Sequence, residues 1–272
     1  MAHDSAEAAR LRVREWVDGA RQIIDVLEDS QMDSIMEAAI LCADAIDAGG
    51  LVHMFGTGHS RIPLEEMFPR YGSFPGFHAI AELSMTFHTQ VVGANGQRQA
   101  MFIERTEGLG EVILSNFAFR ESDVMMVFST GGSTAVPVEV AIGARNRGLA
   151  VVAVTGVEHS LASLPGHSSG TRLLDHADVV IDLGIPSGDS LVAIGDVRVG
   201  PGSTVANVTV VNAIKVAVAS LLSERGSLPP VITGSQIVGS QESLELFDMA
   251  YADHARRLAR ALSSPEPDDG EG

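Results

Sequence analysis

The sequence predicts an α/β fold in which a mostly parallel sheet carries helices on both faces. Short apolar runs recur along the chain, and each is short enough for a strand that is buried on both sides. Segments with helical patterns follow these runs, and strands that alternate with helices form parallel sheets. The expected strands cover residues 51–55, 124–128, 150–154 and 179–183, with shorter strand-like pieces at 191–194 and 197–199.

Helical patterns precede and follow the expected sheet. Within residues 1–50, apolar residues recur at helical spacing on two successive faces, which predicts a pair of helices that ends at Gly49 and Gly50. Another helix is expected to begin near Pro137, since proline is favoured in the first turn, and to end before Gly148. Two more helices are expected, a long apolar one over roughly 205–222 and an amphipathic one through Leu244, Phe247, Tyr251 and Leu258.

These patterns divide the chain into four expected parts. Residues 1–50 form an N-terminal helical segment, and residues 51–225 form the α/β domain. Residues 226–263 form a C-terminal helical extension that we expect to mediate dimerisation. Residues 264–272 are rich in acidic residues, proline and glycine, a composition that predicts a disordered tail.

The composition excludes several classes of partner. The chain has 272 residues and a net charge of −17, which argues against binding to nucleic acid or to an anionic membrane. Its single cysteine, Cys42, cannot form an internal disulfide and fits a reducing compartment. We find no signal peptide and expect no apolar stretch long enough to span a bilayer. The sequence therefore predicts a cytoplasmic protein.

Two loops rich in Gly, Ser and Thr directly follow expected strands. Residues 56–60 read Gly-Thr-Gly-His-Ser, and residues 129–134 read Ser-Thr-Gly-Gly-Ser-Thr. Glycine lets the backbone approach a ligand closely, and hydroxyl and N–H groups at a helix N-terminus bind anions. The first loop does not match the dinucleotide-binding fingerprint Gly-x-Gly-x-x-Gly, because Arg61 stands at the position of its third glycine. Either loop alone could be a plain strand-to-helix connection, but the pair predicts a pocket for a small phosphorylated molecule.

A third turn of similar composition precedes the long apolar helix. Residues 200–204 read Gly-Pro-Gly-Ser-Thr, and Ser203 or Thr204 is well placed as the helix N-cap. We therefore expect three helix N-termini to converge on one crevice.

The loop at residues 129–134 resembles the phosphosugar loop of the sugar isomerase (SIS) domain family, which usually reads Ser-x-Ser-Gly-x-Ser/Thr. The first loop, with Gly56, Gly58 and Ser60, resembles the Gly-x-Gly-x-Ser loop of that family, and the Gly-Pro-Gly-Ser-Thr turn resembles a late SIS element. The resemblance covers about residues 51–222. The chain is also similar to a small bacterial SIS subgroup, through its Gly-x-Gly-His-Ser loop and a Pro-x-Gly-Asp turn at 186–189. One departure is Gly131, which stands where the family has its second serine.

The resemblance implies a flavodoxin-like three-layer sandwich that binds a phosphorylated sugar and assembles as a homodimer or homotetramer. Some family members are enzymes, and others are sugar-phosphate sensors within transcription regulators. We expect no helix-turn-helix module here, and the acidic charge disfavours DNA. The residues expected to bind substrate or phosphate are Gly56, Gly58, Ser60, Ser129, Gly131, Gly132, Ser133, Thr134, Ser203 and Thr204.

Three residues are candidates for catalysis. Enzymes of this kind first remove the proton beside the sugar carbonyl, which requires a carboxylate or a histidine as base. Glu82 follows a strand-like segment that begins at His78, and ligands bind at the carboxyl ends of such strands. Glu107 lies in a Glu-Gly-x-x-Glu segment that resembles one in the N-acetylmuramic acid 6-phosphate etherases. His59 lies within the first loop, where a bound ligand would meet it.

Each of these residues, and several of their neighbours, could instead have a different or purely structural role. Glu82 could be a solvated loop residue, and the cluster around Glu107 could simply begin a helix. Arg61 could face a phosphate or pair with a glutamate one helical turn later. His78 and His88 flank Glu82, and either could be catalytic. The spacing of His and Cys residues predicts no metal site, and no cofactor is expected.

The leading interpretation is an enzyme that acts on an amino-sugar phosphate such as N-acetylglucosamine 6-phosphate. Glu82 and Glu107 would divide the base and acid roles, so that the enzyme deprotonates C2 and eliminates the C3 group as a lyase or dehydratase. The alternatives are an aldose–ketose isomerase, which starts by removing the same proton, and a phosphosugar sensor without catalytic activity.

Overall fold

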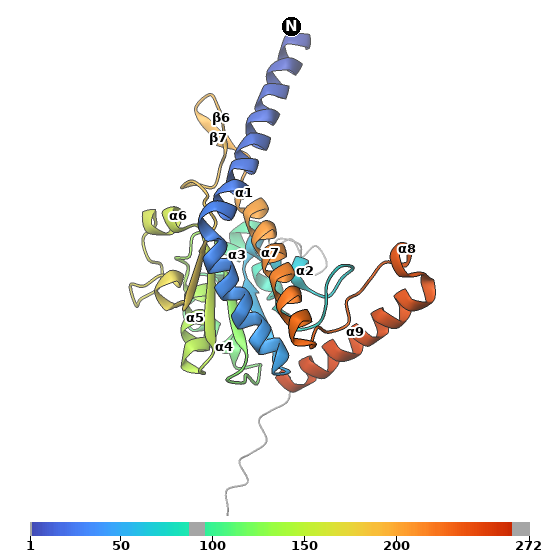
Figure 1. The fold of residues 1–272 in the computed structure, drawn as a ribbon. Coiled ribbons are helices and arrows are strands. Elements are labelled where there is room, and N and C mark those ends of the chain that lie inside the picture. The colour runs from blue at the N-terminus through green and yellow to red at the C-terminus, as the bar shows by residue number, and fades with distance from the viewer. Residues whose placement is uncertain (1, 87–95, 263–272) are drawn as a thin grey trace, which may run out of the picture.

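A computed structural model describes residues 2–86 and 96–262 (Figure 1). Within these residues, five parallel strands form one sheet in the order β2-β1-β3-β4-β5. The expected strands are confirmed to within two residues at each end, and the segment that begins near His78 is also a strand. The bounds are β1 Val52–Gly56, β2 Phe77–Ile80, β3 Val124–Phe128, β4 Ala150–Thr155 and β5 Val179–Asp182.

The strands are buried on both faces, as their continuous apolar runs predict. In β3, Val124 and Met126 pack into one hydrophobic cluster, whereas Met125 and Val127 pack into a second cluster on the opposite face. The sheet therefore separates two cores.

Helices cover both faces of the sheet and give the predicted α/β sandwich of three layers (Figure 1). The first cluster contains side chains of α1 (Ala2–Asp47), α2 (Ile62–Met67) and α7 (Ser203–Arg225), and the second contains those of α4 (Leu109–Leu114) and α5 (Ala135–Asn146). The remaining elements are α3 (Gly96–Ile103), α6 (Val157–Ala162), α8 (Ser235–Val238), α9 (Ser240–Ala261) and an antiparallel hairpin of β6 (Val192–Ile194) and β7 (Val197–Val199).

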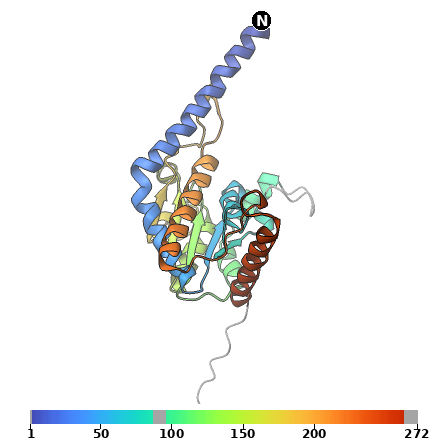
Figure 2. The ribbon, with the colours of Figure 1, turned by 45° about the vertical axis from the view of Figure 1, so that its right-hand side comes forward.

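The N-terminal segment is one continuous helix, so the expected pair of helices is wrong. No proline interrupts α1, and both apolar faces lie on the same helix. Residues 5–15 are exposed and project beyond the rest of the molecule (Figure 2), whereas Ile23, Leu27 and Ile35 are buried against the sheet and α7. Gly49, with φ of +76°, follows the helix end as predicted.

Helix α7 corrects a second expectation. Among the described residues, it is the one helix long and apolar enough to cross a membrane, with a mean hydropathy of 1.8 over its most apolar window. However, Val210, Ile214 and Val218 are fully buried within the first cluster. Lys215 also lies in this helix, and its ammonium group donates to the Glu66 carbonyl at 2.8 Å. Helix α7 is thus long and apolar because it packs against the sheet on one side and α1 on another.

Helix α9 is attached to the end of α1. The Arg257 guanidinium donates to the carbonyl oxygens of Ile46 at 3.0 Å and Gly50 at 2.9 Å. The acidic tail expected at residues 264–272 lies outside the described residues.

Candidate functional site

A pocket of about 350 Å³ lies where β1 and β3 end. The two strands are neighbours, and their register pairs Gly56 with Phe128, so the loops that follow them leave the sheet side by side. The end of α3 and one turn of α6 complete the walls. The lining residues are Thr57–Ser60, Ala100, Met101, Glu104, Arg105, Ser129–Thr134, His159 and Ser163.

The glycines of the first loop shape its turn. A side chain at Gly56 would place its Cβ 2.3 Å from the Ser60 carbonyl oxygen, and Gly58 adopts φ of +55°. The tight turn brings His59 and Ser60 to the pocket wall. Gly56 itself is the last residue of β1 and does not line the pocket.

The second loop forms the opposite part of the lining. The Ser129 hydroxyl accepts a hydrogen bond from the Gly132 amide at 3.2 Å, and Gly132 adopts φ of +56°. Thr134 is the N-cap of α5 and makes no side-chain capping bond, so the first N–H groups of α5 are not satisfied by its hydroxyl. The structure therefore brings together Gly58, His59, Ser60, Ser129, Gly131, Gly132, Ser133 and Thr134.

The third predicted loop does not join this pocket. Among the described residues that line it, neither Ser203 nor Thr204 is present, and the N-cap of α7 is Gly202 rather than either of them. The Asp189 carboxylate accepts hydrogen bonds from the amides of Gly202 at 3.0 Å and Ser203 at 2.8 Å, and from the Ser203 hydroxyl at 2.6 Å. An anionic side chain thus already caps this helix, and the expected convergence of three helix N-termini is wrong.

Glu104 is a pocket residue that the sequence did not single out. It follows α3, lies half-buried, and accepts a hydrogen bond from the Thr57 hydroxyl at 2.6 Å. Burial raises the pKa of this carboxyl above its usual value, against the opposing effect of the Thr57 hydrogen bond. A half-buried carboxylate with a raised pKa can accept and return a proton. The available signal was its place at the start of the acidic segment 104–111.

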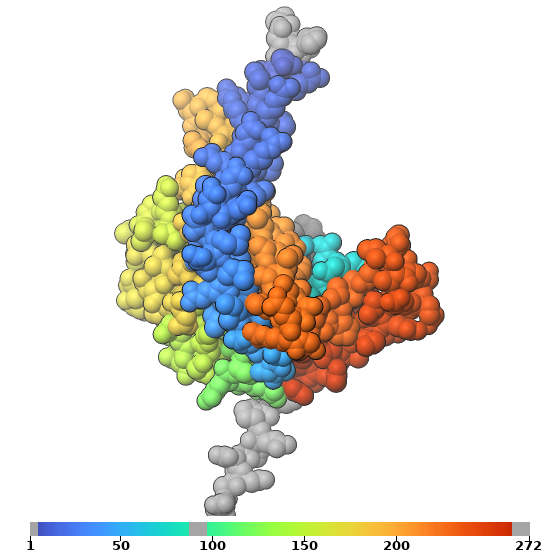
Figure 3. All heavy atoms as spheres, in the orientation of Figure 1, coloured from blue at the N-terminus to red at the C-terminus, as the bar shows by residue number. Residues whose placement is uncertain are grey.

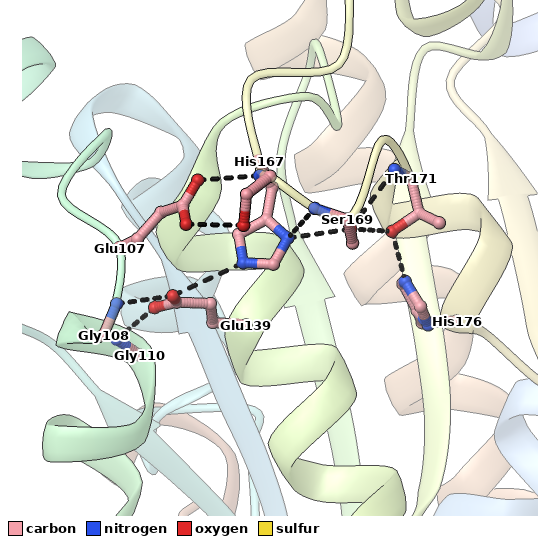
Figure 4. Close-up of polar contacts among 9 residues, drawn as sticks. Glu107, Gly108, Gly110, Glu139, His167, Ser169, Thr171 and His176 are labelled. Atoms are coloured by element: carbon pink, nitrogen blue, oxygen red, sulfur yellow. Dashed lines mark hydrogen bonds and ion pairs between the residues drawn. The ribbon is translucent and has the colours of Figure 1, made fainter.

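The Glu107 carboxylate binds a neighbouring loop (Figure 4), and Glu107 is not among the described residues that line the pocket. Its carboxylate accepts hydrogen bonds from the amide and the hydroxyl of Ser168, each at 2.7 Å, which lower its pKa, the hydroxyl bond most. Nearby, Glu139 accepts from the Gly110 amide at 2.8 Å and lies 3.5 Å from the ring of His167. Further hydrogen bonds link the His167 ring through Ser169 and Thr171 to His176 (Figure 4).

Glu82 follows β2, as expected, but its carboxylate accepts hydrogen bonds from the nearby residue Ser84. It accepts from the Ser84 amide at 3.2 Å and the Ser84 hydroxyl at 3.0 Å, and so caps a short 3₁₀ turn. Glu82 is not among the described residues that line the pocket. His88 lies outside the described residues.

Cationic side chains contribute little to the pocket. Arg61 pairs with Glu65 one helical turn later, as the second of its two expected roles predicts, and it does not line the pocket. Arg105 lines it, but its guanidinium donates to the Met101 carbonyl at 2.6 Å. Backbone dipoles and neutral donors therefore dominate the environment that an anion would meet. Within the described residues, no group of three His, Cys, Asp or Glu side chains could hold a metal ion.

His53 and His78 are neighbours in the register of β1 and β2 and form a buried hydrogen-bonded chain with Asp123. They lie near the strand ends that are farther from the pocket. His53 Nδ1 lies 2.8 Å from His78 Nδ1, and His53 Nε2 lies 3.3 Å from the Asp123 carboxylate. Asp123 therefore accepts from His53 Nε2–H, and His53 Nδ1 accepts from His78 Nδ1–H. Burial, followed by the neighbouring imidazoles of His53 and His254, lowers the pKa of His78 from 6.5 to about 3. These histidines stabilise the fold rather than line the pocket.

Comparisons with known proteins show the family of this chain. A family model described as the SIS domain matches residues 15–156. The UPF0309 protein of Streptomyces coelicolor is 31% identical over 232 residues, which cover 84% of this chain and 90% of that protein. The UPF0309 protein of Caldanaerobacter subterraneus is 32% identical over 249 residues, which cover 89% of this chain and 98% of that protein.

Among solved structures, a phosphoheptose isomerase from Neisseria gonorrhoeae superposes with a TM-score of 0.48 at 15% identity, covering 79% of this chain and 98% of that one. The family resemblance predicted from the two loops is thereby confirmed by the family model and by the full-length relatives. The chain belongs to the SIS domain family.

Proposed function

We propose that this protein is an aldose–ketose isomerase for a phosphorylated sugar and that Glu104 is its catalytic base. One observation carries the proposal: a half-buried carboxylate with a raised pKa lines the same pocket as a Gly/Ser/Thr loop at a helix N-terminus. The loop supplies donors for a phosphate, and the carboxylate supplies the group that moves a proton.

The proposed reaction needs a single base. Glu104 takes the proton from C2 of the open-chain aldose, and the electrons of the C–H bond form an enediolate. Glu104 then delivers to C1 either this proton or a solvent proton that has replaced it on the carboxyl, which gives the ketose. The His59 imidazole, on the first loop, would transfer the proton between the O1 and O2 oxygens. No external oxidant or reductant is required.

Elimination from an amino-sugar phosphate such as N-acetylglucosamine 6-phosphate is the second candidate. The etherase-like segment around Glu107 favours it. The reaction begins with the same C2 proton but then needs an acid that protonates the departing C3 oxygen. Because Glu82 and Glu107 are engaged outside the described lining, His59 or His159 would have to supply that acid, which makes isomerisation the simpler chemistry for this pocket.

A turnover screen separates these candidates. The purified protein is incubated with the phosphates of glucosamine, N-acetylglucosamine, N-acetylmuramic acid, fructose and sedoheptulose, and the products are identified by NMR. Conversion between aldose and ketose supports the proposal, whereas an unsaturated product would establish elimination. Thermal stabilisation by one of these sugars without turnover would instead indicate a sensor. If no sugar binds or reacts, the proposed function is wrong.

We also propose that the protein assembles as a homodimer or homotetramer through the joint face of α1 and α7, in place of the C-terminal extension that the sequence suggests for this role. An apolar groove of about 880 Å³ runs between these helices, which lie side by side on the surface (Figure 3). Val216 is 71% exposed in this groove, and Met32 and Met36 expose apolar surface beside it. A second copy would cover the groove and could support the projecting residues 5–15 of α1.

The variant Val216→Glu tests this interface. A carboxylate buried in an apolar contact is expected to raise the dissociation constant of the oligomer by about 30-fold or more, which corresponds to about 2 kcal/mol. Light scattering coupled to size-exclusion chromatography measures the mass. Leu164→Glu is the matched control, because Leu164 is 89% exposed but lies on a loop away from this groove. Equal masses for Val216→Glu and the wild type would contradict the proposed interface.

The proposed setting is the cytoplasm. Cys42 is fully buried, and burial raises the pKa of its thiol to about 12, so it stays a neutral, reduced core side chain. Fluorescence microscopy of a tagged chain in the organism that encodes it would check this location.

A further inference from the structure

Gly131 leaves space in the second loop where a side chain would otherwise lie, and His159 borders that space. A Cβ built on Gly131 would lie 3.6 Å from both Cδ2 and Nε2 of His159, which is ordinary van der Waals contact. Gly131 and His159 both line the pocket. The imidazole edge of His159 therefore lies beside the position that a side chain of residue 131 would occupy.

The hydrogen bonding of His159 determines which ring nitrogen carries its proton. The Gly188 amide donates to Nδ1 of His159 at 3.2 Å. Since an amide N–H can only donate, Nδ1 must be the acceptor and the proton of the neutral ring lies on Nε2. Nε2 is the nitrogen beside Gly131, and within the described part of the chain it has no hydrogen-bond partner. The ring thus presents an N–H donor to the pocket.

The same contacts hold this donor in place. Glu158, the residue before His159, accepts from the Ser187 amide at 3.3 Å. Consecutive side chains of α6 therefore hold consecutive amides of residues 187 and 188. The Gly132 amide donates to the Ser129 hydroxyl and is therefore not available to a ligand, whereas the Ser129 O–H can still donate. A pocket short of cationic side chains gains a fixed neutral donor from His159.

We infer that His159 is a phosphate-binding residue, whose Nε2–H takes the place of a side-chain hydroxyl at position 131. This inference rests on the proposed function, because it assumes that the ligand carries a phosphate. It deepens that proposal by naming a ligand-binding group from α6, outside both Gly/Ser/Thr loops. His159 is expected to donate to a phosphate oxygen directly, not merely to hold residues 187–188.

Two variants separate binding from loop support. His159→Ala removes the donor and is expected to weaken phosphate binding by about tenfold to 100-fold, the usual range for a hydrogen bond to a charged group. Gly131→Ser in the His159→Ala background restores a hydroxyl beside the vacated space but does not restore the Gly188 contact. Residue 131 has no positive φ, and no atom lies closer than 3.6 Å to its built Cβ, so serine fits there. The double variant is expected to recover affinity to within about threefold of wild type.

The affinities are measured by calorimetric titration with inorganic phosphate and with each sugar phosphate of the screen, and circular dichroism checks that the variants fold. His176→Ala is the matched control, because it removes an imidazole outside the pocket lining. If the wild type binds none of these ligands, the proposed function fails and this inference fails with it. If the wild type binds but His159→Ala binds equally well, the inference alone is wrong. Loss without rescue by Gly131→Ser would also overturn it, since His159 would then act only by supporting residues 187–188.

Discussion

Replacing Glu104 with glutamine is expected to lower turnover of the active phosphosugar by about 10³-fold while changing its affinity less than about threefold. Glutamine has nearly the same shape, and its side-chain oxygen can still accept the hydrogen bond from the Thr57 hydroxyl. What it lacks is the ability to take up a proton. Steady-state kinetics give the turnover, and calorimetry of the variant with the same sugar gives the affinity.

The two other glutamates provide the controls for this result. Glu82 and Glu107 are engaged by Ser84 and Ser168, outside the described pocket lining. Turnover by Glu82→Gln and Glu107→Gln is therefore expected to stay within about threefold of wild type. A large loss in both of these variants, with an active Glu104→Gln, would contradict the role of Glu104 and would favour elimination by the pair that the sequence singled out.

The second large expected effect concerns the stability of the fold in acid. The pKa of His78 falls from 6.5 to about 3 on folding, so between these values the unfolded chain binds a proton that the folded chain excludes. Above pH 6.5, His78 is neutral in both states and does not lower the free energy of unfolding. As the pH falls from 6.5 toward 3, protonation of His78 in the unfolded chain lowers the free energy of unfolding by about 1.4 kcal/mol per pH unit. Between pH 6.5 and about pH 5, this group should lower the free energy of unfolding by about 2 kcal/mol.

Urea unfolding of wild type and His78→Gln at pH 6.5 and at about pH 5 measures the contribution of His78 to the free energy of unfolding. Glutamine can still donate to His53 Nδ1 but does not titrate, so the acid-induced loss should be about 2 kcal/mol smaller in the variant. The comparison between the proteins cancels groups that titrate equally in both. An identical loss in the two proteins would mean that His78 is not the source of the acid sensitivity.

The sheet and the two pocket loops were predictable because their signals are local. Val124–Phe128 is apolar throughout because both faces of β3 are buried, and Gly58 and Gly132 have positive φ values that glycine adopts readily. Since adjacent parallel strands end at the same edge of a sheet, finding two such loops was enough to predict one pocket between them.

The errors arose where distant residues decide the outcome. Ser203 follows a turn typical of a helix start, but Asp189 occupies the amides there, and no local pattern links the two. Glu104 and Glu107 lie in the same acidic segment, and no local pattern shows which of them faces the pocket. Which of them lines the pocket depends on how α3 packs beside the first loop, through the bond to Thr57. Helix α1 continues through two apolar faces because the sheet and α7 support its second half.

The most direct test of the account is proton exchange at C2. Wild-type protein is incubated in D₂O with each phosphosugar of the screen, with Glu104→Gln alongside. NMR follows the proton on C2 of each aldose and the corresponding proton on C1 of each ketose. The account predicts that wild type exchanges this proton for deuterium and that the variant does so about 10³-fold more slowly. If Glu104→Gln converts a bound sugar phosphate at the wild-type rate and with the same movement of this proton, proton abstraction by Glu104 is contradicted.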